Sequence, residues 1–358
     1  MEYVRYFCCR CKEPKETDYG YELLSLDSEE PWSLSCDKLD EWFDANLKEG
    51  TESCEAFRKA ALTVYEDIGW MYTRGWIPYK CDKFILGGSV GKRTMLSDHS
   101  DVDLVVFIST DHLKPISSYP SPKDYTAKLK QVIDGFARAM ESVGMEVIRC
   151  DDFLVCFETK VGQKIMRVDL LPTASNGERE KVYREMFQLT KLAKSTAEYS
   201  ASLVEYQRKF VANKPEAVRE LICLVKHWAC TKLPEELQKS YPLELITIHH
   251  WEEAGGPADF SKAQGLKAVL CALANLKKER KYWKDYYGKD LALKSMKSQG
   301  MKNPLVLDPA NPMNNVCAVY HRRDNMQRIE QVAEETLRTP LLKNVRIRSK
   351  WRRDISYA

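Results

Sequence analysis

One apolar stretch that begins with two aspartates constrains the fold of this chain more than any other feature. Residues 87–107 read GGSVGKRTMLSDHSDVDLVVF, in which a glycine-rich turn is followed by Asp101 and Asp103 and then by a run of apolar residues. On a β-strand, side chains at i and i+2 project to one face about 7 Å apart. Because an unpaired carboxylate is costly to bury, the pattern predicts a buried strand whose two acids share cations.

The glycine-rich turn before the two acids does not match a P-loop. That motif needs four residues between its glycines and Ser or Thr after the lysine. Here three residues separate Gly87 from Gly91, and Arg93 follows the lysine, which excludes a P-loop NTPase. Backbone N–H groups in a glycine turn can still approach a phosphate closely. We therefore expect a phosphate-contacting turn formed by Gly88, Ser89 and Lys92.

A third acid, Asp169, interrupts another apolar stretch, MRVDLLP. Taken alone it could pair with Arg167 or Lys164 on a surface strand, and the first two acids could be turn residues. Together with the glycine turn, the three acids favour a metal site. Carboxylate oxygens suit Mg²⁺, which keeps waters and substrate phosphates in its shell, and a third carboxylate would hold a second ion near the attacking hydroxyl. The sequence predicts a nucleotide–Mg²⁺ site, with Mn²⁺ as the alternative ion, formed by Asp101, Asp103 and Asp169.

The hydrophobic period changes along the chain and divides it. At 358 residues the chain exceeds the usual size of a single core. Short β-rich runs up to Pro172 predict a mainly antiparallel or mixed sheet, and the later pattern is almost wholly helical. We expect a poorly ordered or loosely docked tail over 1–35, an α/β lobe over 36–172 and a helical lobe over 173–358. The expected strands lie within 83–88, 103–108, 146–159 and 164–172, and the expected helices span 35–47, 56–72, 125–143, 178–187, 195–212, 215–232, 241–253, 263–287 and 325–337.

The segment 215–232 shows how a helix of the second lobe could reach a cleft. Its apolar stripe predicts one buried face. Arg219, Cys223 and Lys226 lie within about 60° of one another beside that stripe. Lys226 can therefore face the cleft, although an ordinary solvated lysine is an equal alternative from the pattern alone. The stripe consists of Val218, Leu221, Ile222, Val225 and Trp228.

Over residues 35–351 the chain resembles the 2′-5′-oligoadenylate synthetases, a family of polymerase-β-like nucleotidyltransferases. The glycine turn and the DxD pair would specify only the superfamily, whereas LVKHW, the LEL helix and LDPANP together are specific to this branch. The matching segments occur in the family's order: GGSVGKRTMLSDHSDVDLVVF, VDLLPT, EYQRKFVANKPEAVRELICLVKHWA, YPLELITIHHWE, AQGLKAVL, YWKDYY and VLDPANPMNN.

The resemblance implies a fold and an activity. The fold would be α+β and two-lobed, with a mixed sheet and helices in the first lobe, a helical second lobe and the active site in the cleft. Asp101, Asp103 and Asp169 fall on the family's metal-binding acids, Lys226 on its donor-triphosphate contact and Tyr241 on its nucleotide-contacting tyrosine. The implied reaction is Mg²⁺-dependent, template-independent joining of ATP into 2′-5′-linked oligoadenylates with release of pyrophosphate, activated by double-stranded RNA in innate antiviral signalling.

Two alternative functions remain open at this point. A cyclic-dinucleotide synthase would use the same acids, but the Cys/His zinc insertion of its best-known branch is missing from this sequence. A catalytically inactive RNA-binding module has no reason to keep three buried acids, so the intact carboxylates argue against it.

Several positions depart from the vertebrate members of the family. Cys223 stands where they carry Arg, and Ser240 where they carry Gln, and both positions bear on adenosine selection and on product linkage. Arg93 replaces a glycine. On the side that contacts RNA, the changed positions are Leu86, Ala212 and Glu216.

Basic residues are the candidates for contacting RNA, because phosphate contacts dominate duplex affinity. The net charge is only +3, and residues 16–50 hold eleven acids against two bases. Arg74, Arg208 and Lys214 remain as candidates. So does a basic C-terminal end, for which a solvated tail is an equal alternative; it consists of Lys343, Arg346, Arg348, Lys350, Arg352 and Arg353.

The sequence shows no signal peptide and no apolar run of about 18 residues that would cross a membrane. Its twelve cysteines are scattered, which indicates reduced thiols and a cytoplasmic protein, with the nucleus as the alternative. Cys8, Cys9 and Cys11 lack a fourth zinc ligand at finger spacing, so we expect a frayed tail there and not a zinc half-site or a palmitoylation site. The histidines His227, His249 and His250 are expected to pack or cap, because the metal site prefers oxygen.

Overall fold

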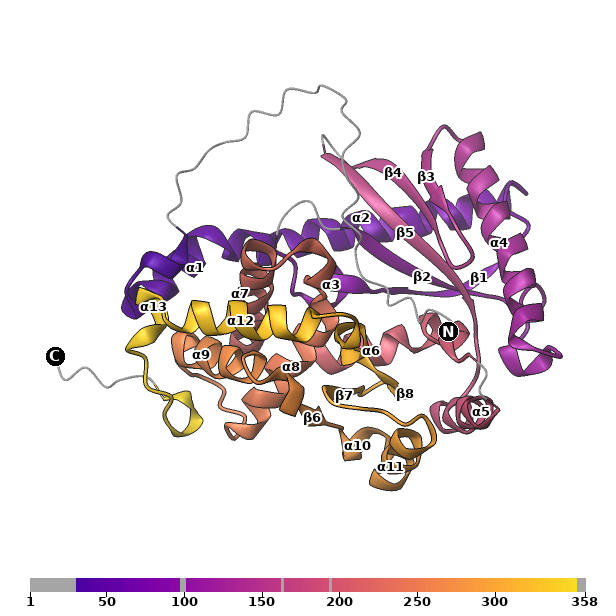
Figure 1. Cartoon of the computed structure of the whole chain (residues 1–358). Helices are drawn as coiled ribbons and strands as arrows, with labels where there is room; N and C mark the ends of the chain where they lie inside the picture. The colour runs from indigo at the N-terminus through magenta and orange to yellow at the C-terminus, as the bar shows by residue number, and fades with distance from the viewer. Residues whose placement is uncertain (1–29, 97–100, 162–163, 193–194, 353–358) are drawn as a thin grey trace.

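The computed structural model describes residues 30–96, 101–161, 164–192 and 195–352. A five-stranded sheet with its flanking helices forms one lobe, and a group of packed helices with a small second sheet forms the other (Figure 1). This arrangement is the predicted α+β fold of two lobes. Residues 1–29, which include Cys8, Cys9 and Cys11, and residues 97–100 of the opening motif lie outside the described residues.

The large sheet is mixed, as predicted. Its strands lie in the order β1-β2-β5-β4-β3. Strand β2 pairs with β5 in parallel, and the other three pairings of this sheet are antiparallel. The strands are β1 (Cys81–Leu86), β2 (Val102–Ile108), β3 (Glu146–Cys150), β4 (Val155–Val161) and β5 (Lys164–Ala174).

One face of the sheet is covered by apolar packing. Strand alternation places Val102, Leu104 and Val106 of β2 on this face, and all three are buried. Helix α4 (Pro122–Ser142) packs in the same core. Ser121 caps the start of this helix, because its hydroxyl accepts a hydrogen bond from the Asp124 N–H. Helix α2 (Lys48–Thr73) contributes to the same core. The opposite face of β2 carries the acids at its start, and farther along it carries a smaller apolar cluster that includes Val105 and Phe107.

The second lobe is built mainly of helices, close to the predicted ranges. The stripe predicted on α7 is confirmed, because its five apolar side chains are fully buried. Before α6, the predicted helix begins with two short 3₁₀ turns. The lobe contains α6 (Val204–Ala212), α7 (Glu216–Lys232), α8 (Ser240–Glu253), α9 (Lys262–Leu273), α12 (Asn325–Leu337) and α13 (Pro340–Lys343). The buried side chains of α5 (Arg179–Lys191) pack in the core of the sheet lobe instead.

The single helix predicted over 263–287 is wrong. Helix α9 ends at Leu273, and the chain then forms a short strand, β6 (Arg280–Lys281), which pairs with β7 (Leu305–Asp308). The Leu305 N–H donates to the Glu279 carbonyl at 2.9 Å, so pairing with a distant strand overrides the local helix propensity. The remaining elements of this part are α10 (Lys284–Tyr287), α11 (Lys289–Ser298) and β8 (Asn311–Asn315).

The chain docks earlier than the expected tail boundary. A 3₁₀ turn over Pro31–Ser33 buries Trp32, which is 4% exposed. Helix α1 (Leu39–Asn46) follows, and its Leu39 and Phe43 side chains pack in the core of the helical lobe. The first described residues thus belong to the packing of the second lobe.

Across the described ranges, every helix is too short or too polar to traverse a lipid bilayer.

Candidate active site

The three predicted acids lie together on the face of the sheet opposite α4. In the parallel pairing of β2 with β5, Asp103 lies directly beside Asp169. Asp101 precedes β2 and points to the same face as Asp103 by strand alternation. The register of two strands therefore brings together carboxylates that are 66 residues or more apart in sequence.

Two arginines and a cysteine that sequence reasoning did not assign share this face. Cys156 of β4 pairs with Asp169, and Arg149 of β3 pairs with Cys156. The Arg149 Nη2 reaches Asp169 Oδ2 at 3.7 Å across the thiol. The Arg167 Nε lies 4.0 Å from Asp101 Oδ1. The alternating patterns of EVIRC and VCFETK could have indicated which face of its strand Arg149 or Cys156 occupies. They could not have indicated that these strands lie beside the strand that carries Asp169.

Burial and mutual repulsion raise the pKa values of two of the acids. Burial, reinforced by the charge of Asp169, raises the pKa of Asp103 to about 7, although Lys92 opposes the shift. Burial and Asp169 likewise raise the pKa of Asp101 to about 6, against the influence of Arg167 and Arg149. Crowded carboxylates with raised pKa values are candidates for a functional site.

The glycine turn presses against one of these carboxylates. Helix α3 (Gly88–Lys92) starts at Gly88, whose φ is +54°. A Cβ atom on Gly88 would lie 1.8 Å from Asp103 Oδ2, and one on Gly91 would lie 2.1 Å from the Leu86 carbonyl oxygen. The Gly87 N–H also donates to the Asp103 carbonyl at 2.8 Å. A side chain at Gly91 would therefore collide with the backbone, and one at Gly88 would displace the Asp103 carboxylate. The first residues of α3, including Ser89, lie beside Asp103.

Arg93, which ends α3, has a left-handed backbone with φ 60° and ψ 43°. We expect Arg93→Gly to raise the free energy of unfolding by about 0.5–1 kcal/mol, because this conformation costs a residue with a Cβ about 1–2 kcal/mol and the freer unfolded chain offsets part of the gain. Urea denaturation would measure it. Arg93→Ala keeps the Cβ and removes the same charge, so equal stability of the two variants would contradict the prediction.

Lys92 is held between an acid and a ring of the other lobe. Its Nζ lies 2.8 Å from Glu244 Oε2 of α8 and 4.1 Å from the centroid of the Tyr241 ring. The Thr94 hydroxyl donates to the other oxygen of Glu244 at 3.3 Å. Two residues predicted to contact the nucleotide, Lys92 and Tyr241, thus lie together, and Glu244 was missed because nothing local marks it.

Lys226 faces the first lobe, as the helical pattern allowed. It is buried, and its Nζ donates to the Thr94 carbonyl at 2.7 Å. One turn earlier on α7, the buried Cys223 thiol lies 3.8 Å from the Met95 carbonyl. The two side chains therefore contact consecutive residues after α3.

A fully buried acid outside the predicted set holds Tyr241. Asp308 is 0% exposed and accepts hydrogen bonds from the Tyr241 hydroxyl at 2.8 Å, from Gln207 Nε2 at 2.7 Å and from the Ala310 N–H at 2.8 Å. Burial raises its pKa. The LDPANP segment, which is part of the family resemblance, therefore positions the ring that contacts Lys92.

The predicted RNA contacts are only partly presented to solvent. Lys214 is 14% exposed, and its Nζ lies 3.0 Å from Glu252 Oε1 and over the rings of Phe210 and Trp251. The structure thus counts against Lys214 as an RNA contact. Arg74 is exposed over the Trp70 ring, and Arg208 is half-buried beside α3.

The basic C-terminal end is docked and not a loose tail. Its Trp351 is buried against Phe260, and the Ser261 N–H donates to the Trp351 carbonyl at 2.9 Å. The described basic side chains of this end are exposed, and Arg353 lies outside the described residues.

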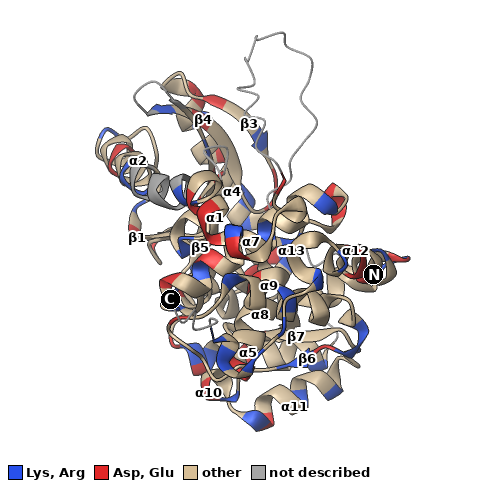
Figure 2. Ribbon diagram, turned by 90° about the vertical axis from the view of Figure 1, so that its left-hand side faces the viewer, with Lys and Arg blue, Asp and Glu red and all other residues tan. Residues whose placement is uncertain are grey.

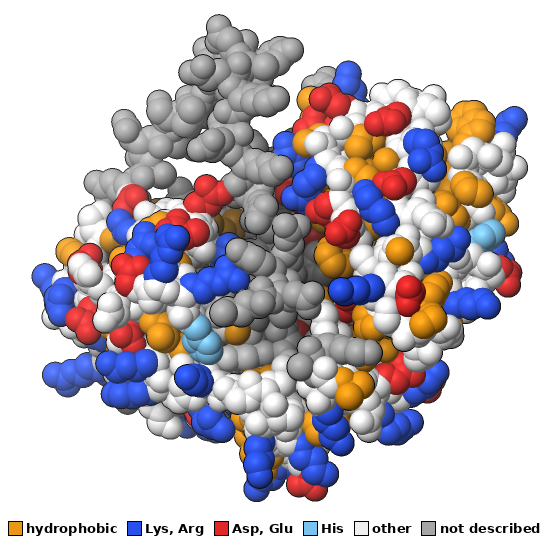
Figure 3. Space-filling model, turned by 45° about the vertical axis from the view of Figure 1, so that its right-hand side comes forward, with side chains coloured by type: hydrophobic (Ala, Val, Ile, Leu, Met, Phe, Trp, Pro, Cys, Tyr) orange, Lys and Arg blue, Asp and Glu red, His pale blue; other side chains and the backbone are white. Residues whose placement is uncertain are grey.

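Charge over the rest of the surface is mixed, with basic and acidic positions interspersed on the ribbons of both lobes (Figure 2). A further group of Lys and Arg side chains appears at the lower end of the face in Figure 3, where α10 and α11 lie. The exposed lysines of this part are Lys284, Lys289, Lys294, Lys297 and Lys302.

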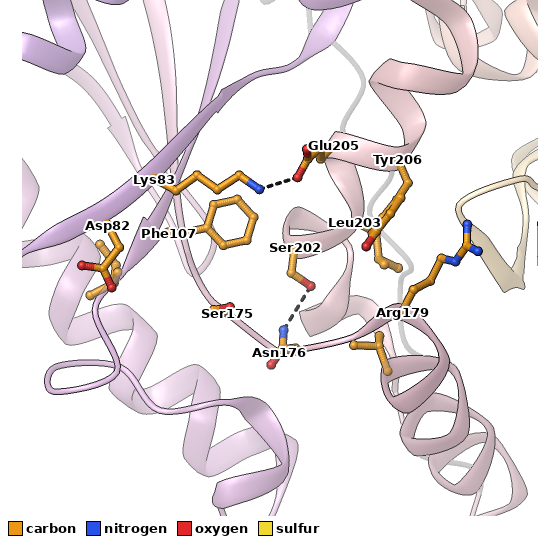
Figure 4. A pocket seen from close by; sticks show the side chains of 13 residues that line it. Asp82, Lys83, Phe107, Ser175, Asn176, Arg179, Ser202, Leu203, Glu205 and Tyr206 are labelled. Atoms are coloured by element: carbon orange, nitrogen blue, oxygen red, sulfur yellow. Dashed lines mark hydrogen bonds and ion pairs between the residues drawn. The ribbon is translucent and has the colours of Figure 1, made fainter.

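A cavity of about 280 Å³ lies at the other end of the sheet from the acids (Figure 4). It is lined where β5 leaves the sheet and where α6 begins. Across it, Lys83 forms an ion pair with Glu205, and Asn176 Nδ2 donates to the Ser202 hydroxyl at 3.0 Å. Phe107 lines it from β2, four residues beyond Asp103, so this cavity is separate from the acids.

Comparisons with known proteins agree with the sequence resemblance. The family model described as "2'-5'-oligoadenylate synthetase 1, domain 2, C-terminus" matches residues 176–355. The chain is 26% identical over 339 residues to rat 2'-5'-oligoadenylate synthase 1A, covering 86% of this chain and 91% of the relative. It is 32% identical over 249 residues to cattle 2'-5'-oligoadenylate synthase 2, covering 64% of this chain and 34% of that relative.

One similar protein is described as inactive. The rat inactive 2'-5'-oligoadenylate synthase 1B is 29% identical over 294 residues and covers 74% of this chain and 75% of its own length. Among solved structures, Escherichia coli MS115-1 CdnC in complex with HORMA-deltaN has a TM-score of 0.55 at 18% identity and covers 85% of this chain and 89% of that chain. That likeness supports the nucleotidyltransferase fold.

Proposed function

Because this chain belongs to the 2′-5′-oligoadenylate synthetase family of nucleotidyltransferases, we propose that it joins ATP into 2′-5′-linked oligoadenylates with release of pyrophosphate, using Mg²⁺. The observation that carries the proposal is the group of three carboxylates that two paired strands place beside the α3 turn. Family membership alone does not decide activity, since one relative is described as inactive.

The residues present fit Mg²⁺. The site offers carboxylate oxygens, which this ion prefers, and the raised pKa values of Asp101 and Asp103 indicate carboxylates crowded together without enough compensating charge. Asp101, Asp103 and Asp169 would hold the ions. Bound there, Mg²⁺ would neutralise the triphosphate and favour ionisation of the acceptor hydroxyl.

The protein's own groups would orient the donor nucleotide. The α3 turn, with Gly88 and Ser89, lies on the Asp103 side of the site, so the triphosphate belongs there. Lys92 is close enough to lower the pKa of Asp103 and would add positive charge to that side. Lys226 donates to the carbonyl of Thr94, two residues after Lys92. The Tyr241 ring contacts Lys92 directly and is held by Asp308.

Asp169 would serve the acceptor side. It lies one strand further from α3 than Asp103 does. We expect Asp169→Ala to bind ATP with Mg²⁺ within about threefold of wild type and to form no internucleotide bond, because the acceptor hydroxyl would lack its orienting carboxylate. Nucleotide affinity and turnover, measured on the same preparation, would test this.

Asp101→Ala is the comparison for that experiment, since it removes a carboxylate from the triphosphate side. It should weaken nucleotide binding as well as turnover. Equal loss of ATP affinity in the two variants would mean that the three acids act as one undivided cage.

We also propose that double-stranded RNA activates the enzyme, in the cytoplasm and in innate antiviral signalling. The exposed basic candidates Arg74 and the basic C-terminal end support an RNA contact. Because Lys214 is engaged by Glu252 and Ala212 and Glu216 are not basic, fewer phosphate contacts should give a shallower salt dependence of binding than in a relative that keeps them.

The decisive experiment incubates purified protein with mixed NTPs and Mg²⁺ or Mn²⁺, with and without duplex RNA. Products are then digested with nucleases specific for 2′-5′ or 3′-5′ linkages. Linear 2′-5′ oligoadenylates that increase with RNA support the proposal. A cyclic dinucleotide would favour the synthase alternative, and RNA binding without product would favour the inactive module.

A further inference from the structure

A second cluster of metal-binding side chains lies at the end of α8 farthest from Tyr241. His249, His250 and Glu253 each direct one ligand atom into this cluster, and the three atoms lie within 4.8 Å of one another. His249 Nε2 is 3.7 Å from one oxygen of Glu253, and His250 Nδ1 is 3.5 Å from the other. Spacings of i+3 and i+4 place Glu253 on the same helix face as both rings.

A buried carboxylate supports the cluster from another part of the chain. Glu279, which precedes β6, is 8% exposed, and its Oε1 lies 3.2 Å from His250 Nε2. Its second oxygen has no hydrogen-bond partner among the described residues. A buried carboxylate with so little compensation is costly, and a cation bound to the imidazole it contacts would reduce that cost.

The chemistry of the donors selects the metal. Two imidazole nitrogens and one carboxylate form a set that zinc enzymes use, with water in the fourth position. Tetrahedral zinc would separate its ligand atoms by about 3.4 Å, so the three donor atoms, which lie within 4.8 Å of one another, would need to move closer together by small side-chain rotations. A metal-bound histidine usually donates its other N–H to a carboxylate, as His250 does toward Glu279.

The surroundings allow a cation to enter and remain. The side chain of Glu253 is 58% exposed, so the cluster is open to solvent on one side. It lies in the last turn of α8, where the helix dipole favours positive charge. The neighbouring Lys281 is paired with Glu252 at 3.6 Å, which offsets its repulsion.

From these observations we propose that His249, His250 and Glu253 bind one Zn²⁺ ion, with Glu279 orienting His250. The ion would tie the end of α8 to the segment before β6. The same helix carries Tyr241 and Glu244 at its start, so the metal stabilises the lobe that positions them. This site is distinct from the carboxylates, and its histidines act as ligands where the sequence pattern favoured packing or capping.

The test uses the full-length chain with Cys8, Cys9 and Cys11 replaced by Ser, so that thiols of that segment do not bind the probe. The protein is reduced, treated with chelator and returned to excess Mg²⁺, which occupies hard-oxygen sites. Zn²⁺ binding is measured by competition with a chromophoric chelator, and Co²⁺ replaces Zn²⁺ for visible spectroscopy. We expect one Zn²⁺ per chain, a higher Tm with Zn²⁺ and a four-coordinate Co²⁺ spectrum without a thiolate charge-transfer band.

Variants assign the ligands. Glu253→Gln, at a side chain that is 58% exposed, and His250→Gln should each weaken Zn²⁺ binding at least about tenfold and abolish the Tm increase. Glu279→Gln should weaken it about 10- to 100-fold. His112→Asn, a partly buried histidine next to Tyr79, should change nothing. Failure to bind Zn²⁺, or unchanged affinity in Glu253→Gln and His250→Gln, would overturn the proposal, and neither readout depends on nucleotide synthesis.

Discussion

Asp103→Asn should abolish oligonucleotide synthesis and at the same time stabilise the metal-free protein. Loss of one carboxylate from the cation site should lower turnover at least about 10³-fold, equivalent to about 4 kcal/mol. The amide keeps the shape of the side chain and removes a charge that is half-buried next to Asp169. Pyrophosphate release and thermal unfolding in a chelator would measure the two effects.

The gain in stability should depend on pH. Because the pKa of Asp103 is about 7 in the folded chain and about 3.9 when unfolded, the folded state binds more protons between these values. The free energy of unfolding of the metal-free wild type therefore falls as pH rises from about 4 to about 7. The Asn variant does not lose stability in this way, so its free energy of unfolding should equal that of the wild type near pH 4 and exceed it by about 2 kcal/mol at pH 7. This difference is smaller than the full pKa shift would give, because Asp103 is partly exposed to solvent.

Asp82→Asn provides the matched control. Asp82 is an exposed acid of the same sheet, in β1, where it lies 3.8 Å from Lys80. Turnover and the unfolding temperature at pH 7 should both stay close to those of the wild type. If Asp103→Asn kept a tenth of the wild-type turnover, or unfolded at a lower temperature than wild type at pH 7, the assignment of this carboxylate would be wrong.

Gly88→Ala should lower turnover about 100-fold while leaving the protein folded. The new methyl group would occupy the place of Asp103 Oδ2, only 1.8 Å away, so the carboxylate must rotate out of its position. A displacement of about 1 Å at a reacting centre can cost about 10²-fold in rate. The positive φ of Gly88 adds about 1–2 kcal/mol of backbone strain. Steady-state kinetics and urea denaturation would separate the two effects.

Gly69→Ala is the control substitution for this experiment. Gly69 lies inside α2, and a Cβ there meets nothing within 4 Å. Alanine should therefore leave turnover unchanged and stabilise the helix by about 1 kcal/mol. If Gly88→Ala retained wild-type turnover, the close contact between the turn and Asp103 would have no role in the reaction.

The acids and the turn were predictable because their signals are local. A charged residue inside an apolar run can be recognised from the sequence. Because side chains of a strand alternate between its two faces, Asp101 and Asp103 can also be assigned to one face. Asp169 was predicted as the third acid from its place in an apolar strand, but its position directly beside Asp103 depends on the parallel pairing of β2 with β5, which a local pattern does not specify. The α7 stripe and the orientation of Lys226 were likewise contained in a helical period.

The features of the site and fold that could not be predicted depend on contacts between distant segments of the chain. Arg149 reaches Asp169 because the sheet order places β3 next to β4 and β4 next to β5, so that the long arginine side chain extends across β4. Glu244 and Asp308 look like ordinary acids until Lys92 and Tyr241 contact them. The break after α9 follows from strand pairing with residues about 25 positions later, which no local propensity records.

The docking of the first described residues has a consequence for how this protein is made. The turn at Pro31–Ser33 packs against α13 (Pro340–Lys343), so the two ends of the described chain meet. During synthesis, Trp32 and Phe43 leave the ribosome early, but the helical-lobe surface that buries them is complete only when Leu341 and Leu342 have emerged. Their apolar side chains must therefore wait until about 300 further residues have been made, and an interrupted chain would expose them to aggregation or to chaperones.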